Sequence, residues 1–162
     1  MVIKENFYRL LLFWTVIVSF IIGGMGCQSK PVGDAPLPAN GFKAEITLKN
    51  PLTSMKVSSS SVIKAMVKNI SEASWPALGQ SSVRLSYHWL SNEGKIIYEE
   101  FEGLRTTLPG DLMPNKEVEL EAKIKTPSKP GNYILEFDMV QEKVSWFKEK
   151  GSKTTQVNTM VE

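Results

Sequence analysis

The chain has 162 residues, 42% of them hydrophobic and 22% charged, which is typical of one globular domain with a short additional segment. Its 19 lysines and arginines against 17 aspartates and glutamates leave a net charge of +2, so there is no basic excess that would attract nucleic acid. One cysteine excludes a disulfide framework and a cysteine-based metal site, and one histidine leaves little imidazole chemistry. We expect no metal and no cofactor.

The first 26 residues have the pattern of a secretory signal. Lys4 and Arg9 precede an uncharged apolar run over residues 10–22, and small residues follow it up to Cys27. The run is shorter than the roughly 20 apolar residues that cross a bilayer comfortably. Residues 1–26 are therefore predicted to be a signal peptide.

Cys27, with Gly26 before it, resembles the lipobox of bacterial lipoproteins, although Gly24 stands where that family usually has leucine. The resemblance implies that Cys27 becomes the mature N-terminus and carries diacylglycerol, whose acyl chains (palmitate, for example) would be the chain's membrane partner. A cleaved secreted protein and an uncleaved anchor, each with a free Cys27, are the alternatives. Gln28 and Ser29 are not the aspartate that retains enteric lipoproteins at the inner membrane. This favours the outer membrane if the organism has two.

Residues 27–41 are expected to be the lipidated cysteine and a proline-rich tether. The segment QSKPVGDAPLPANG holds three prolines and two glycines and has no periodic apolar pattern. Such a linker would hold the following domain a few nanometres from the membrane at most.

From residue 42 onward the chain changes to a two-residue period. Five runs alternate apolar with polar residues, which is typical of strands with one buried and one solvent-facing side. The pattern places His88, Glu136 and Asp138 on solvent-facing sides. The residues predicted to point inward are Phe42, Ala44, Ile46, Leu48, Ile63, Ala65, Val67, Val83, Leu85, Tyr87, Trp89, Val118, Leu120, Ala122, Ile124, Tyr133, Leu135, Phe137 and Met139.

Turn signals separate these runs at the spacing of an all-β domain. The turn at residues 92–94 predicts a hairpin into residues 95–101, and a last strand is expected around residues 154–161. The sequence thus predicts, over residues 42–162, an all-β, immunoglobulin-like antiparallel β-sandwich of seven or eight strands. Trp89 would be the core tryptophan of strand C, and Tyr133 the corner tyrosine that bonds back to the backbone.

Several segments form a more specific set. They are VKNIS (67–71) followed by WP (75–76), LSYHWL (85–90), GLRTTLP (103–109), PGNY (130–133), and VQE (140–142) followed by WF (146–147). The set resembles the bacterial Ig-like β-sandwich domain appended to glycosyltransferases and methyltransferases of envelope polysaccharide pathways. The resemblance covers about residues 62–148. It implies an accessory domain without catalytic residues, and here we expect the domain to stand without an attached enzyme domain.

Catalytic groupings find little support in this sequence. A Ser-His-Asp site would need His88, which the alternation places on a strand surface. The carboxylates Glu99, Glu100 and Glu102 cluster at a strand end without an implied pocket, and such a charge run is usually a solvated edge. We therefore expect no enzyme.

Four residues are candidates for ligand contact. Arg105 could donate its planar guanidinium to the carboxylate or hydroxyls of a sugar. Alternatively it could pair with Asp111 or Glu142, or donate to loop carbonyls, and so hold an irregular loop in shape. The candidate aromatic platform consists of Trp75, Trp146 and Phe147. Trp75 is the one most readily explained as a core residue. Trp146 and Phe147 are adjacent, so on a strand they face opposite sides, and one of them is left for the surface.

The sequence therefore predicts a non-enzymatic, lipid-anchored protein of the cell envelope. Its expected role is a binding or accessory module for an envelope glycan or for polysaccharide machinery. The alternative is a protein–protein adaptor subunit of an envelope complex that docks its partner through a sheet edge or end loops.

Overall fold

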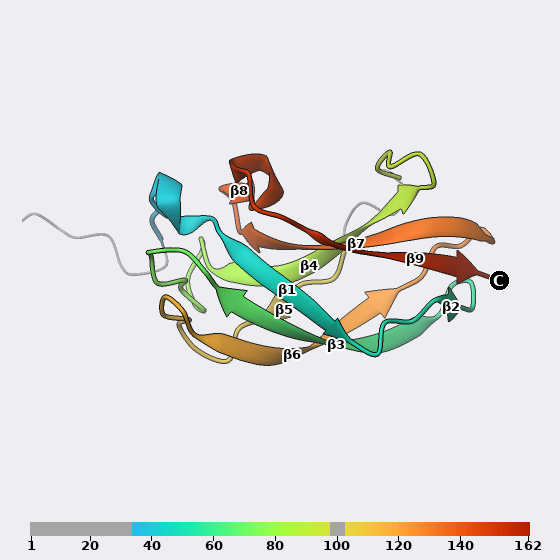
Figure 1. Ribbon diagram of the computed structural model, residues 1–162, viewed down its shortest axis with the longest axis horizontal. Coiled ribbons are helices and arrows are strands. Elements are labelled where there is room, and N and C mark those ends of the chain that lie inside the picture. Colours follow the sequence, from blue (N-terminus) through green and yellow to red (C-terminus); the bar gives the residue numbers. More distant parts are fainter. Residues whose placement is uncertain (1–33, 98–102) are drawn as a thin grey trace, which may run out of the picture.

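The computed structural model describes residues 34–97 and 103–162, and these form an all-β domain (Figure 1). The predicted signal peptide, Cys27 and Glu99, Glu100 and Glu102 lie outside the described residues, as does most of the expected strand at 95–101. The elements are η1 (Ala39–Gly41), β1 (Ala44–Lys49), β2 (Ser54–Met55), β3 (Ser60–Asn69), β4 (Val83–Ser91), β5 (Thr106–Thr107), β6 (Glu117–Lys125), β7 (Gly131–Gln141), β8 (Ser145–Trp146), η3 (Lys148–Lys150) and β9 (Thr155–Val161).

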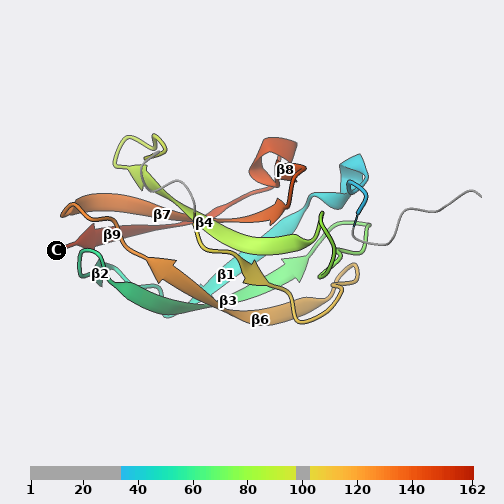
Figure 2. The same cartoon turned by 180° about the vertical axis from the view of Figure 1, so that it is seen from behind.

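The strands form two facing sheets (Figures 1 and 2). One sheet has the order β1-β3-β6, and the other has the order β2-β9-β7-β4-β5, with β8 added on β7. All pairings are antiparallel except that between β2 and β9. The central pairs β3–β6, β4–β7 and β7–β9 correspond to B–E, C–F and F–G of an immunoglobulin domain. The predicted Ig-like sandwich is confirmed, and three two-residue strands bring the number of strands among the described residues to nine.

The core between the sheets contains the residues that the alternation predicts. Trp89, 1% exposed on β4, donates its indole N–H to the carbonyl of Lys125 at 2.9 Å. The hydroxyl oxygen of Tyr87, also on β4, accepts the backbone N–H of Lys125 at 2.8 Å. Tyr133 donates its hydroxyl to the Lys129 carbonyl four residues upstream at 2.9 Å. Both predictions, the core tryptophan and the corner tyrosine, are confirmed.

The expected tether differs from the structure over its described part. The backbone at Leu37 donates to Gln141 Oε1 at 2.9 Å, and Gln141 Nε2 donates to the Ala35 carbonyl at 3.0 Å. Trp75 Nε1 donates to the Gly41 carbonyl at 2.8 Å. Residues 34–41 therefore run along the domain, at the end opposite the C-terminus (Figure 1). The proline-rich composition of this segment indicates that it forms no strand. It cannot indicate that side chains far away in the sequence, such as Gln141 and Trp75, bind the backbone of the segment.

The outer faces of the two sheets differ in exposure. On β3 and β6 the outward residues Lys64, Glu119 and Glu121 are exposed and form ion pairs, as the alternation predicts. On β4 and β7, by contrast, the expectation was wrong: His88 is 5% exposed, and Glu136 and Asp138 are each 1% exposed. The reason is that β8 and η3 fold back over this outer face (Figures 1 and 2).

The buried Gln141 amide provides a test of how residues 34–37 are held. Replacing Gln141 by leucine keeps the volume but removes its bonds to Ala35, Leu37 and Ser81. We expect the free energy of unfolding to fall by roughly 1–3 kcal/mol, because buried backbone groups lose their partners. Urea unfolding followed by tryptophan fluorescence measures this. Lys123→Ala, an exposed control on β6, should change it by less than about 0.5 kcal/mol, and an equal effect of the two variants would contradict the assignment.

Candidate functional site

A cavity of about 260 Å³ lies on the covered outer face of the six-stranded sheet. It forms because β8 turns back onto β7, with Trp146 opposite Val140, and η3 then crosses above the β4–β7 pair. Polar and aromatic groups thus meet from four elements and one loop. The lining residues are His88, Ile96, Glu136, Asp138, Trp146, Lys148 and Glu149.

The floor of the cavity follows from strand register. His88 on β4 is paired with Glu136 on β7, and Ser86 is paired with Asp138 two positions along. Side chains two residues apart share a face, so these four polar groups form a block on one side of the sheet. All four are buried, and burial of polar groups is tolerated only where hydrogen bonds satisfy them.

Glu136 is saturated with donors. Lys148 Nζ binds both of its carboxylate oxygens, at 2.8 and 2.9 Å, while Thr154 and Gln156 donate to Oε1 at 2.9 and 2.7 Å. Burial opposes ionisation of this carboxyl, but the hydrogen bonds from Lys148, Gln156 and Thr154 outweigh it and hold the pKa below its ordinary value. Glu136 is therefore an ionised anchor that ties η3 and β9 to β7.

Asp138 has a different environment. Its Oδ1 accepts the Met139 backbone N–H at 2.8 Å, and its Oδ2 accepts the Lys148 backbone N–H at 3.1 Å. Burial raises the pKa of Asp138 from 3.8 to about 7, because these two hydrogen bonds only partly offset desolvation and the nearby Glu136 charge adds to it. A buried carboxyl poised near neutral pH beside a cavity is a functional-site candidate on physical grounds.

Of the predicted contact residues, Trp146 lines this cavity, and Arg105 packs against the Trp146 ring without lining the cavity itself. The Arg105 guanidinium carbon lies 4.9 Å from the centroid of the Trp146 ring, and the His88 ring centroid lies 4.0 Å from it. Arg105 Nε donates to Glu142 Oε1 at 2.9 Å, and its Nη1 donates to Ser86 Oγ and the Gly103 carbonyl. The pairing with Glu142 and the bond to the Gly103 loop carbonyl both belong to the loop-holding alternative expected for Arg105.

The other two predicted contact residues are core residues. Trp75 and Phe147 are both 0% exposed, so neither offers a ring at the surface for ligand contact. For Trp75 this is the core alternative that the sequence favours, and for the adjacent pair it leaves Trp146 as the surface residue. The Phe147 ring packs edge-on against Trp75 and Phe42, with centroid distances of 5.1 Å in both pairs. Adjacent positions do face opposite sides: Phe147 enters the core, and Trp146 lies on the outer face.

Sequence reasoning missed Glu136, Asp138 and Lys148 as site residues. A signal was present, since two carboxylates spaced two apart on one strand share a face. Their cation, however, comes from a turn ten or more residues later, and no local pattern shows that this turn folds back.

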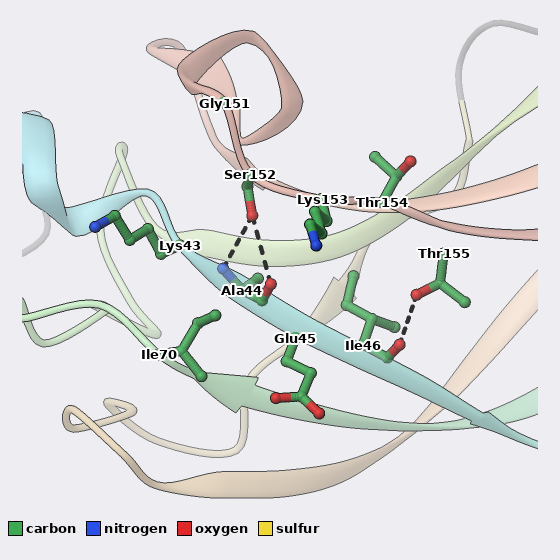
Figure 3. A pocket seen from close by; sticks show the side chains of 10 residues that line it. All are labelled: Lys43, Ala44, Glu45, Ile46, Ile70, Gly151, Ser152, Lys153, Thr154 and Thr155. Carbon is green, nitrogen blue, oxygen red and sulfur yellow. Dashed lines mark hydrogen bonds between the residues drawn. The ribbon is translucent and has the colours of Figure 1, made fainter.

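A larger trough of about 560 Å³ lies along the outer edge of β1 (Figure 3). Ser152 Oγ accepts the Ala44 backbone N–H at 3.0 Å, and Thr155 Oγ1 donates to the Ile46 carbonyl. These hydroxyls occupy backbone groups that a further strand would need, which protects an edge from unwanted pairing. The charged residues of the trough, Lys43, Glu45 and Lys153, are exposed, so it lacks the buried titratable groups of the smaller cavity.

Among residues 34–97 and 103–162, no group of three or more histidine, cysteine, aspartate or glutamate side chains could hold a metal ion. Within the same residues no helix has the length and apolar character needed to span a membrane.

Comparisons with known proteins provide information on the fold alone. No family model matches the chain, and no curated protein matches it in sequence. Among solved structures, the chain is similar to the solution NMR structure of the CARDB domain of a Pyrococcus furiosus protein (15% identity, TM-score 0.42, with 74% of this chain and 94% of that chain covered). The same domain crystallised with di-metal ions is 17% identical (TM-score 0.43, 74% and 86% covered). The sporulation control protein Spo0M from Bacillus subtilis is 11% identical (TM-score 0.44, 74% and 49% covered).

The raised pKa of Asp138 predicts how stability depends on pH. Because the folded state holds this proton more tightly than the unfolded state, unfolding free energy should fall as the pH rises from about 4 through 7. At about 1.4 kcal/mol per pKa unit, the loss is roughly 4 kcal/mol at most. Urea unfolding of the protein and of Asp138→Asn at pH 5 and pH 8 measures it. The asparagine variant should lose much less unfolding free energy between pH 5 and pH 8. Equal pH dependence of the two proteins would contradict the raised pKa of Asp138.

Proposed function

We propose that this protein is a non-enzymatic binding module, anchored at the bacterial cell envelope by lipid on Cys27, and that it binds a glycan at the Trp146 cavity. One observation carries the ligand assignment. The cavity joins an indole wall to two buried carboxyls and a lysine within one small volume.

The chemistry of the cavity suits a sugar ring. Sugars have apolar faces that pack against indole rings and hydroxyls that bind carboxylate and ammonium groups. Arg105 and His88 already pack on the Trp146 ring, so the ring acts as a wall and does not form an open platform. A volume of about 260 Å³ is below the range of drug-sized ligands and fits a single ring with its substituents.

The hydrogen bonds of Ser86, the serine nearest to His88 in sequence, support a non-enzymatic role. Its hydroxyl is directed to the carbonyls of Gly103 and Leu104, both at 3.2 Å, and its oxygen accepts the Arg105 guanidinium. A nucleophile needs its proton taken by a base, whereas this hydroxyl bridges a strand to a loop.

The envelope location rests on the sequence of residues 1–29 and on the resemblance to accessory domains of envelope polysaccharide enzymes. In an organism with two membranes, the proposed location is the outer membrane, because Gln28 and Ser29 follow Cys27.

An adaptor role is the second candidate, and the free edge of β6 favours it. Among the described residues β6 pairs with β3 alone, so one edge of β6 is open to a partner strand, except at Lys125, whose backbone N–H and carbonyl are bound to Tyr87 and Trp89. Its outward Glu119, Glu121 and Lys123 are charged, which protects the edge against non-specific pairing. A protein that binds no glycan but captures an envelope protein, with capture lost on Lys123→Pro, would favour this role.

An array of bacterial envelope glycans tests the first candidate. We expect the detergent-solubilised full chain to bind one glycan class saturably, and Trp146→Ala to weaken binding by about tenfold or more, which is the usual effect of removing a buried aromatic contact. Titration with tryptophan fluorescence measures the affinity. Val62→Ala, an exposed apolar change on the other sheet, is the matched control. An equal loss of affinity in Trp146→Ala and Val62→Ala, or a full chain that binds no glycan, would count against the site.

Lipid attachment is tested separately in the producing cell. Labelling with a fatty-acid analogue should tag the protein, and Cys27→Ser should remove the tag because the thiol that receives the lipid is gone. Mass spectrometry of the mature N-terminus gives the number of acyl chains. An unmodified thiol at Cys27 would show that the secreted or uncleaved alternative is correct.

A further inference from the structure

The two carboxylates in the floor of the Trp146 cavity differ in their countercharge. Lys148 Nζ is bound to both oxygens of Glu136. Asp138, which is equally buried, receives only the backbone N–H groups of Met139 and Lys148, and no lysine or arginine nitrogen of the described residues forms an ion pair with it. Within residues 34–97 and 103–162, Asp138 is therefore a buried carboxylate without a lysine or arginine ion-pair partner.

The charged groups around Asp138 come from every element packed against it. They are His88 on β4, Glu136 on β7, Lys148 and Glu149 in η3, and Arg105 beside Trp146. Glu136 and Lys148 neutralise each other, and Arg105 is paired with Glu142. When Asp138 is ionised and the His88 imidazole is neutral, the cavity is left with the negative charges of Asp138 in its floor and Glu149 at its exposed rim. Such a cavity is complementary to a cation.

The size of the cavity restricts the cation to a small group. About 260 Å³ admits one ring or a short chain, and Ile96 and Trp146 give it apolar walls. An amine carried directly on a sugar ring fits both features, because it brings a positive charge for the carboxylate and an apolar ring face for the walls.

We propose that the ligand of this cavity is an amino sugar whose free, protonated amine pairs with the carboxylate of Asp138, while its ring lies against Trp146. This rests on the proposed function, because it names the class of glycan that the module binds. N-acetylation would remove the charge and add bulk, so the acetylated sugar is disfavoured twice.

Binding is then coupled to the proton on Asp138. The carboxyl must be ionised to pair with the amine, and burial raises its pKa to about 7. Below that pH the affinity for an amino sugar should fall by about tenfold per pH unit. A neutral sugar gains nothing from ionised Asp138, so its affinity should change much less.

Isothermal titration of the detergent-solubilised full chain tests the proposal with three β-1,4-linked tetrasaccharides, those of glucosamine, N-acetylglucosamine and glucose. At pH 7 we expect the glucosamine tetramer to bind at least about tenfold more tightly than the other two. At pH 5.5 most of this preference should disappear. Asp138→Asn should abolish the preference at both pH values.

A second variant keeps the test decisive if Asp138→Asn does not fold. Glu149 is exposed on η3, so Glu149→Gln leaves the buried block intact and should reduce the preference about two- to threefold, the effect of one rim charge. Glu119→Gln, on the opposite sheet, should leave it unchanged. Equal binding of the three tetramers, or binding only of a neutral glycan from the array, overturns the amine pairing and leaves the glycan function standing. Binding of no glycan overturns both.

Discussion

The burial of Glu136 and Asp138 on an outer sheet face is the constraint on which the rest of this structure depends. Outer faces of a sandwich are normally wet, and covering two carboxylates there is costly unless donors replace the water. Lys148 provides them twice, with its side chain to Glu136 and its backbone to Asp138. The turn that follows β8 is therefore held in place by the groups that it hides.

That turn also links the outer face to the core. Trp146 and Phe147 are consecutive, so the chain that places an indole over His88 must place the Phe147 ring between Trp75 and Phe42. Trp75 in turn binds the carbonyl of Gly41, where residues 34–41 join the domain. A change at the cavity wall is thus connected, through one peptide unit, to the packing of the N-terminal segment.

The two-residue period predicted the sandwich because it reports which side of a strand each residue occupies. It placed Trp89 and Tyr133 correctly, since their roles depend on a strand and its adjoining turn. It failed for His88, Glu136 and Asp138, because alternation specifies a side and does not say whether another segment covers it. It also failed for residues 34–41, whose attachment depends on Gln141, about 100 positions away. The sequence left open whether Arg105 contacts a ligand or holds its loop, and the loop-holding role could be recognised only once the position of Glu142 was known.

The same physics explains why a cavity remains at this place. A turn that covers two carboxylates with one lysine can neutralise only one of them. Glu136 is the one that binds Lys148, and it also accepts hydrogen bonds from Thr154 and from Gln156 on β9. Asp138 keeps backbone donors, which satisfy its hydrogen bonds without cancelling its charge. Full closure over it would bury an unbalanced charge, whereas an opening next to it lets solvent or a ligand provide the balance. The cavity is thus the part of the outer face that the covering turn leaves incomplete.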